Sequence, residues 1–184
     1  MTALALSSEI RARWRVRISY PVALACLWLA WPTPASLALG ASIAAAGLLV
    51  RGAAAGHLRK GEQLATSGPY ACTRNPLYLG SALLATGFAV GSHSWLVAGI
   101  LVAYFAVFYP ATMRQEEQEL RARYGGAFDD YAARVPLFWP RPSRAGAGDA
   151  RFSWALYRRN REYQAALGFL AGVALLWLRM LWRG

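Results

Sequence analysis

Residues 57–78, HLRKGEQLATSGPYACTRNPLY, bring together side chains whose types suit ligand binding. Arg74, Asn75 and Pro76 come directly before an apolar stretch, and proline suits the first turn of a helix, where an amide N–H would have no partner. Asn75 is then the expected N-cap residue. A guanidinium just outside the positive end of a helix predicts that Arg74 binds an anionic group. The alternative is an interfacial loop without chemistry, whose Arg and Tyr side chains extend to lipid head groups.

Residues 113–140 contain a second cluster of ionisable side chains. Glu117 and Glu119 each lie four residues before an arginine, which predicts solvated ion pairs worth about a few tenths of a kcal/mol. Glu116 instead shares an apolar helical stripe with Leu120, just after an apolar block, where a carboxylate needs a partner. We therefore predict that Glu116 is a functional acid.

The two segments together resemble the integral membrane methyltransferases of the isoprenylcysteine carboxyl methyltransferase-like and phospholipid methyltransferase families. The similarity covers roughly residues 51–140. It is carried by GPYACTRNPLY, an apolar helix, and then EE-x-x-L-x-x-x-Y-G-x-x-F-x-x-Y-x-x-x-V-P-x-x-x-P. The resemblance implies S-adenosylmethionine as the cofactor, in a pocket at the membrane surface.

The resemblance also implies which residues form the site. Arg74 and Glu116 are the expected catalytic residues, and no metal is expected. The family pattern often reads Arg-His-Pro where this chain has Asn75, and an amide cannot titrate near neutral pH. Cofactor binding is expected of His57, Gly68, Tyr70, Arg74, Asn75, Pro76, Tyr78, Glu116 and Glu117.

The elements that must position these residues are apolar helices. Hydrophobic residues make up 57% of the 184 residues and fall in blocks, as membrane spans do. Several blocks are shorter than the roughly 20 residues of a perpendicular span, so flanking arginines such as Arg51 and Arg179 are expected to snorkel. We predict one domain, an all-α integral membrane helical bundle with about five transmembrane helices and a cytoplasmic cofactor-binding loop and helix. The five blocks are residues 18–31, 35–50, 77–91, 95–113 and 165–178.

Turn signals predict how neighbouring blocks connect. The Pro-rich segment 31–34 predicts a tight hairpin between the first two helices, and residues 91–94 predict another between the third and fourth. Small residues in the second block permit close helix approach. The first block also fits a signal peptide, although the second apolar block follows almost at once.

The distribution of the 20 Lys and Arg residues predicts the orientation. Residues 1–20 hold four, 51–76 hold four and 114–163 hold ten, whereas 32–34 and 92–94 hold none. The positive-inside rule then places the N-terminus and both candidate segments in the cytoplasm, at a bacterial inner membrane. The net charge is +11, and the arginines that carry it flank apolar blocks, which favours lipid head groups over nucleic acid as the partner.

The C-terminal part follows a Pro- and Gly-rich linker at 141–150. Residues 151–184 are expected to form an interfacial helix and a membrane helix, as a wall for a lipophilic substrate or as an anchor.

The predicted function is S-adenosylmethionine-dependent methyl transfer to a lipophilic, membrane-embedded acceptor. Carboxylate O-methylation and amine or phospholipid N-methylation both remain open. Lys60 is the sole lysine, which indicates a GC-rich bacterial genome where prenylated proteins are not expected substrates. The alternatives are an NADPH-dependent membrane reductase of the sterol-reductase type and a non-enzymatic membrane scaffold.

Overall fold

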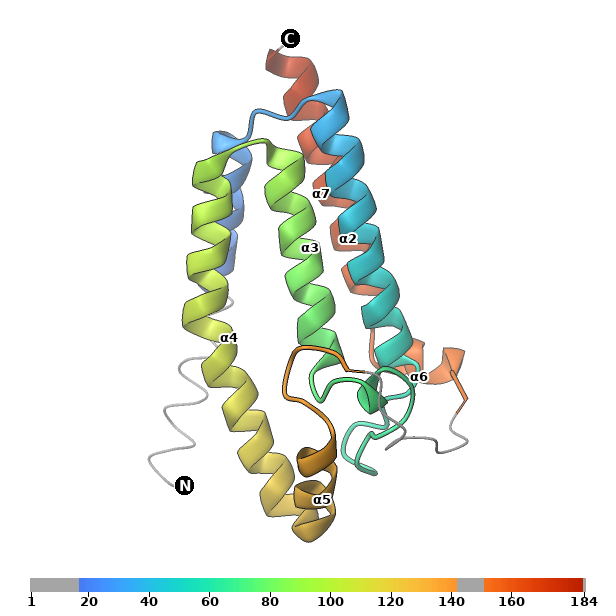
Figure 1. Cartoon of the computed structure of the whole chain (residues 1–184). Helices are drawn as coiled ribbons and strands as arrows, with labels where there is room; N and C mark the ends of the chain where they lie inside the picture. The colour runs from blue at the N-terminus through green and yellow to red at the C-terminus, as the bar shows by residue number, and fades with distance from the viewer. Residues whose placement is uncertain (1–16, 142–150, 184) are drawn as a thin grey trace.

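The computed structural model describes residues 17–141 and 151–183, and within these ranges it contains helices and no strands (Figure 1). The all-α prediction is therefore confirmed. The N-terminal arginines before Arg17 and residues 142–150 of the expected linker lie outside the described residues. In chain order the elements are a helix at Arg17–Leu29, α2 (Pro34–Ala55), the 3-10 helix η1 (Gly68–Ala71), α3 (Pro76–Ser92), α4 (Trp95–Tyr124), α5 (Gly126–Arg134), α6 (Trp154–Arg159) and α7 (Tyr163–Arg183).

Three of the described helices, α2, α4 and α7, are long and apolar enough to cross a membrane. Two shorter apolar helices, Arg17–Leu29 and α3, run beside them. Large apolar side chains such as Leu49 and Trp95 lie exposed on the bundle, as expected of surfaces that face lipid. The chain is thus built for a membrane, and the count of five spans stays a prediction.

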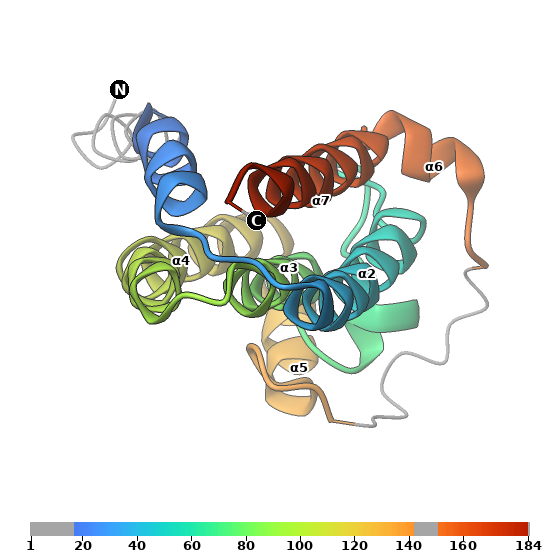
Figure 2. The same ribbon diagram turned by 90° about the horizontal axis from the view of Figure 1, so that it is seen from above.

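Helices α2 and α3 pack with almost no side chain between them. A Cβ added at Gly40 would lie 2.4 Å from the carbonyl oxygen of Gly87, and one added at Gly47 would lie 2.6 Å from that of Gly80. These distances confirm the close approach that the small residues predict. Helix α7 packs on one side of the α2–α3 pair (Figure 2).

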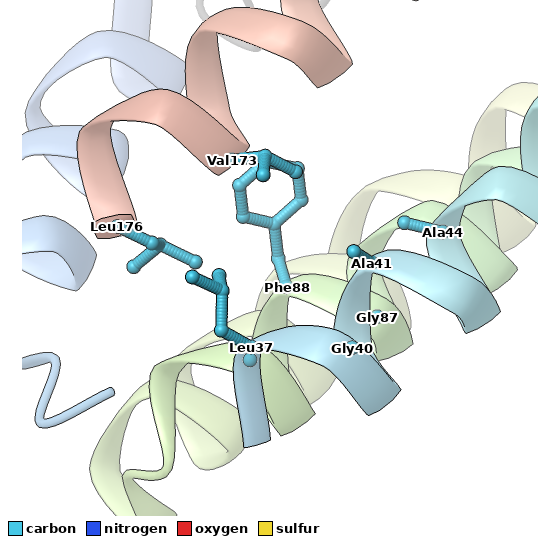
Figure 3. A pocket seen from close by; sticks show the side chains of 9 residues that line it. Leu37, Gly40, Ala41, Ala44, Gly87, Phe88, Val173 and Leu176 are labelled. Carbon is cyan, nitrogen blue, oxygen red and sulfur yellow. The ribbon is translucent and has the colours of Figure 1, made fainter. Parts of the chain in front are cut away.

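A small hollow remains where α2, α3 and α7 meet (Figure 3). Phe88 of α3 points from its helix towards Val173 of α7, and Leu37 and Leu176 lie beside it. A Cβ added at Gly172 would lie 2.0 Å from the Phe88 ring, so this glycine makes room for the phenyl group. The hollow is a feature of apolar packing and carries no polar lining.

One of the two predicted hairpins is present in the structure and the other is not. Helices α3 and α4 are joined by His93 and Ser94 alone, as predicted. The tight hairpin between the first helix and α2 is wrong, because the connection runs across the end of the bundle and separates the two (Figure 2). The Trp31 amide donates to the Ser92 carbonyl at 2.7 Å, so the last residue of α3 supplies a hydrogen-bond acceptor for the backbone of this connection.

The C-terminal end of α7 lies at the same end of the bundle as these connections (Figure 1). Arg179 of α7 contacts the first helix at this end. Its Nη2 donates to the Trp28 carbonyl at 2.8 Å, and its guanidinium lies 5.3 Å from the Trp28 ring centre. The first helix is therefore held to α7 by a cation–π contact and a charge-assisted hydrogen bond.

Helix α4 is longer than its apolar block. It continues through Pro110 to Tyr124 and extends past the ends of α2 and α3 towards α5 (Figure 1). The chain turns at Gly125, with φ 53°, and α5 packs Phe128 and Tyr131 against the loop that follows α2. Both candidate segments thus meet at one end of the bundle.

Candidate functional site

Arg74 and Glu117 form an ion pair between the start of α3 and the extended part of α4. Their Nη1 and Oε1 atoms are 2.6 Å apart, and the side chains are only 16% and 20% exposed. The predicted Glu117–Arg121 pair is wrong, because Arg121 binds Asp129 at 2.7 Å instead. Glu117 lies on the side of α4 that faces α3, so the arginine of the loop before α3 replaces its neighbour along α4.

The Arg74 guanidinium keeps one buried donor unused. Its Nε atom has no hydrogen-bond partner among the described residues. A buried N–H without an acceptor is costly, and guanidinium groups bind carboxylates with two parallel donors. Arg74 is therefore equipped to hold a second anionic group beside Glu117.

Tyr78 and Glu116 make a second link between α3 and α4. The Tyr78 hydroxyl donates to Oε1 of Glu116 at 2.8 Å, and the Tyr78 ring meets the edge of Tyr109, with centres 5.4 Å apart. Glu116 is exposed, and the Tyr78 hydroxyl is the partner that a carboxylate after an apolar block was predicted to need. The inward stripe is formed by Met113, with Glu117 and Leu120 following at helical spacing.

The loop before α3 is fixed by the segment that follows α5. The Arg74 amide donates to the Pro136 carbonyl at 2.9 Å, and the Thr73 hydroxyl donates to that of Phe138 at 3.0 Å. Asn75 occupies the N-cap position as predicted, but its side chain makes no capping bond and donates to the Leu137 carbonyl at 3.0 Å. Pro76 begins α3 as predicted. The two motifs of the sequence therefore bind each other directly.

Tyr70 lies buried in η1, below these pairs. The Tyr131 hydroxyl donates to the Tyr70 carbonyl at 2.7 Å. Burial raises the pKa of the Tyr70 hydroxyl far above its ordinary value, and the neighbouring Tyr131 and the Glu116 carboxylate add to the rise. Tyr70 is thus neutral at physiological pH and can donate a hydrogen bond there.

His57 and Gly68 contact each other. A Cβ at Gly68 would lie 2.7 Å from Nε2 of His57, and Gly68 has φ 59°, a conformation that glycine adopts readily. Nδ1 of His57 lies 2.8 Å from the Ala53 carbonyl oxygen, which favours a proton on that nitrogen. The ring also meets Phe152 edge-on, at 6.2 Å between centres. These contacts do not join His57 to the Arg74 or Glu116 pairs.

Arg51 and Glu162 form a further buried pair that the sequence reasoning missed. Arg51 was expected to snorkel. Instead its Nε and Nη2 donate to the two Glu162 oxygens at 2.5 and 3.0 Å. Glu162 is 7% exposed and is the only acid in the Arg-rich stretch RRNREYQ before an apolar span. A lone acid at that place is the signal that could have identified it.

The region of the sequence that holds these pairs matches a known protein family. The sequence model of the family described as phospholipid methyltransferase matches residues 35–127, about half of the chain. The chain belongs to this family. The matched region runs from α2 into the start of α5, so it holds both the Arg74–Glu117 pair and the Tyr78–Glu116 pair.

Two curated proteins resemble the chain over 85 residues each. The nickel-cobalt-cadmium resistance protein NccN of Alcaligenes xylosoxydans xylosoxydans is 42% identical, and the cobalt-zinc-cadmium resistance protein CzcN of Cupriavidus metallidurans is 40% identical. The match covers 46% of this chain and 39% of each relative, so the chain aligns with about two-fifths of their length. No solved structure matches the chain significantly.

Proposed function

We propose that the protein transfers a methyl group from S-adenosylmethionine to a lipophilic acceptor embedded in the membrane. The observation that carries this proposal is the pairing of Arg74 with Glu117 and of Tyr78 with Glu116, at the end of the bundle where α3 begins and α4 continues past it. Membership of the phospholipid methyltransferase family supports it.

The residues fit the cofactor group by group. The unused Nε donor of Arg74 suits the cofactor's carboxylate. The carboxylates of Glu116 and Glu117 suit its amino group and ribose hydroxyls. The face of the Tyr78 ring offers a surface for a positive charge. S-adenosylmethionine supplies an electrophilic methyl group on a sulfonium sulfur.

The contribution of the protein to such a reaction is positioning and exclusion of water. A carboxylate acceptor is already ionised and needs no base, whereas an amine acceptor must lose a proton. Glu116, which is exposed, and His57 are the groups that could take that proton. Tyr70 is kept neutral, and the Asn75 amide is engaged with Leu137, so neither is assigned the role of a base.

The orientation follows from the charge distribution, and we place the site in the cytoplasm. The Arg-rich segments 51–76 and 151–163 meet at the end of the bundle that holds the site, next to the head groups of the inner leaflet. Membrane lipids and a lipophilic substrate are thus the proposed partners. The metal-resistance names belong to the relatives, and the proposal does not draw on them.

Substitution of Arg74 tests the proposal. S-adenosylmethionine should bind the purified wild-type protein in calorimetry, and Arg74→Ala should weaken binding at least about thirtyfold, because a buried charge partner is lost. Arg134→Ala is the matched control, since Arg134 is exposed on α5 and its side chain bonds the Asp130 carbonyl of its own helix. This variant should bind as the wild type does.

Two outcomes would overturn the proposal. One is a wild-type protein that fails to bind S-adenosylmethionine at millimolar concentration. The other is thermal stabilisation by NADPH alone, which would favour the reductase of the sterol-reductase type. If S-adenosylmethionine binds, mass spectrometry of lipid extracts incubated with labelled methyl donor would identify the acceptor.

A further inference from the structure

The segment before α7 closes over the loop that follows α2. The Ser153 amide donates to the Gly56 carbonyl at 3.0 Å, and the Asn160 side chain donates to the carbonyls of Ala55 and Leu58 at 2.9 and 2.8 Å. Gly56 leaves space for the neighbouring aromatic ring of Phe152, since an added Cβ would lie 2.2 Å from it. This docking is specific, and it lies outside the region that the family match covers.

Glu162 ends this segment and binds Arg51 with both carboxylate oxygens. The same guanidinium donates through Nη1 to the Ser81 hydroxyl at 2.5 Å and to the Leu77 carbonyl at 3.3 Å. A Cβ added at Gly80 would lie 2.4 Å from Cγ of Arg51, so this glycine admits the arginine to the helix interface. One guanidinium thus ties α2, the first turn of α3 and the start of α7 together.

The first turn of α3 is the part that presents the candidate site. Leu77 is the residue before Tyr78 and lies three residues after Arg74. Tyr70 experiences the charges of Glu116, Glu162 and Arg51, so the buried pair and the site lie within electrostatic reach of one another. Because the Leu77 carbonyl accepts from Arg51, a displacement of Arg51 would move the first turn of α3 and, with it, the two links to α4.

A buried ion pair is weak evidence for stability, because apolar replacements of such pairs are often neutral. The role of the Arg51–Glu162 pair is better explained by its bidentate geometry, which fixes the orientation of the guanidinium as well as its distance from the carboxylate. We propose that Glu162 is a positioning residue: through Arg51 it holds the first turn of α3 so that Arg74 and Tyr78 meet Glu117 and Glu116. This inference rests on the proposed function.

Glu162→Gln in the full chain tests the inference, with S-adenosylmethionine as the probe. The matched control is Glu62→Gln, because the Glu62–Arg159 pair links the same two segments but is 49% and 61% exposed. Glu162→Gln should raise Kd at least about tenfold, as loss of a buried charge partner does. Glu162→Asp, which keeps the charge, should recover part of the affinity. Glu62→Gln should stay within about twofold of the wild type.

The unfolding midpoint of the cofactor-free protein separates positioning from structural support. Binding measured well below that midpoint reports folded molecules, so a merely structural residue would lower the midpoint and leave Kd unchanged. That result for Glu162→Gln would overturn the inference while the proposed function stands. Absence of binding to the wild type would overturn both.

If Glu162→Gln does not fold, Arg51→Lys takes its place in the test. Lysine keeps the charge and loses the bidentate contact, so affinity should still fall, and wild-type affinity would refute the positioning role.

Discussion

The adjacent carboxylates Glu116 and Glu117 differ in their partners. Glu117 faces the Arg74 guanidinium, which compensates its charge, whereas Glu116 accepts a hydrogen bond from the neutral Tyr78 hydroxyl. Glu116 is also exposed, whereas Glu117 is partly buried. The two acids are thus suited to different tasks within one turn of helix.

Tyr78→Phe tests the role of the hydroxyl at this scale. The hydroxyl fixes the Glu116 carboxylate beside α3, so its loss should weaken S-adenosylmethionine binding by at least roughly tenfold. Tyr20→Phe, at an exposed position on the first helix, is the control and should change nothing. Unchanged affinity in Tyr78→Phe would remove Tyr78 from the site.

Single residues were predicted unevenly for a physical reason. The sequence identified Arg74 and Pro76 because helix-terminus chemistry is local. It assigned Glu117 to Arg121 because four-residue spacing is visible along one helix, while the competing partner on α3 is not. Glu162 was missed because its partner lies 111 residues away.

At the scale of elements, the α2–α3 contact depends on glycine. Gly40→Ala would place a Cβ within 2.6 Å of backbone atoms of Gly87 and Gly91, which cannot rotate away. Such overpacking costs about 1–3 kcal/mol, so the unfolding midpoint in detergent should fall.

Gly99→Ala is the control for this prediction. Nothing lies within 4 Å of a Cβ at Gly99 on α4, so alanine should be neutral or stabilise the helix by up to about 1 kcal/mol. Equal midpoints for the two variants would contradict the close packing of α2 and α3.

Helices were predictable from apolar periodicity and breakers, and the close approach of α2 to a neighbour from its small residues, whereas the identity of each neighbour was not. The block at residues 95–113 and the acidic helix after it form one element, α4, because Pro110 does not end the helix. The first hairpin was wrong because a Pro-rich break determines where a helix ends and leaves its later direction open.

For the whole molecule, the orientation is open to a direct test. Residue 63 follows α2 and residue 95 begins α4, at opposite ends of the bundle (Figure 1). With Cys26 and Cys72 replaced by alanine, Trp95→Cys should react with a membrane-impermeant maleimide in intact spheroplasts. Gln63→Cys should react only after permeabilisation. The reverse pattern would place the site outside the cytoplasm.

Pro110 has a mechanical consequence for the site. Proline has no amide hydrogen, so the Ala106 carbonyl lacks its usual helical donor and α4 is held by fewer bonds at that point. Glu116 and Glu117 both lie beyond it, whereas Tyr78 and Arg74 belong to the start of α3. Any bend of α4 at Pro110 would therefore move both carboxylates together, and the two links to α3 would lengthen or shorten in concert.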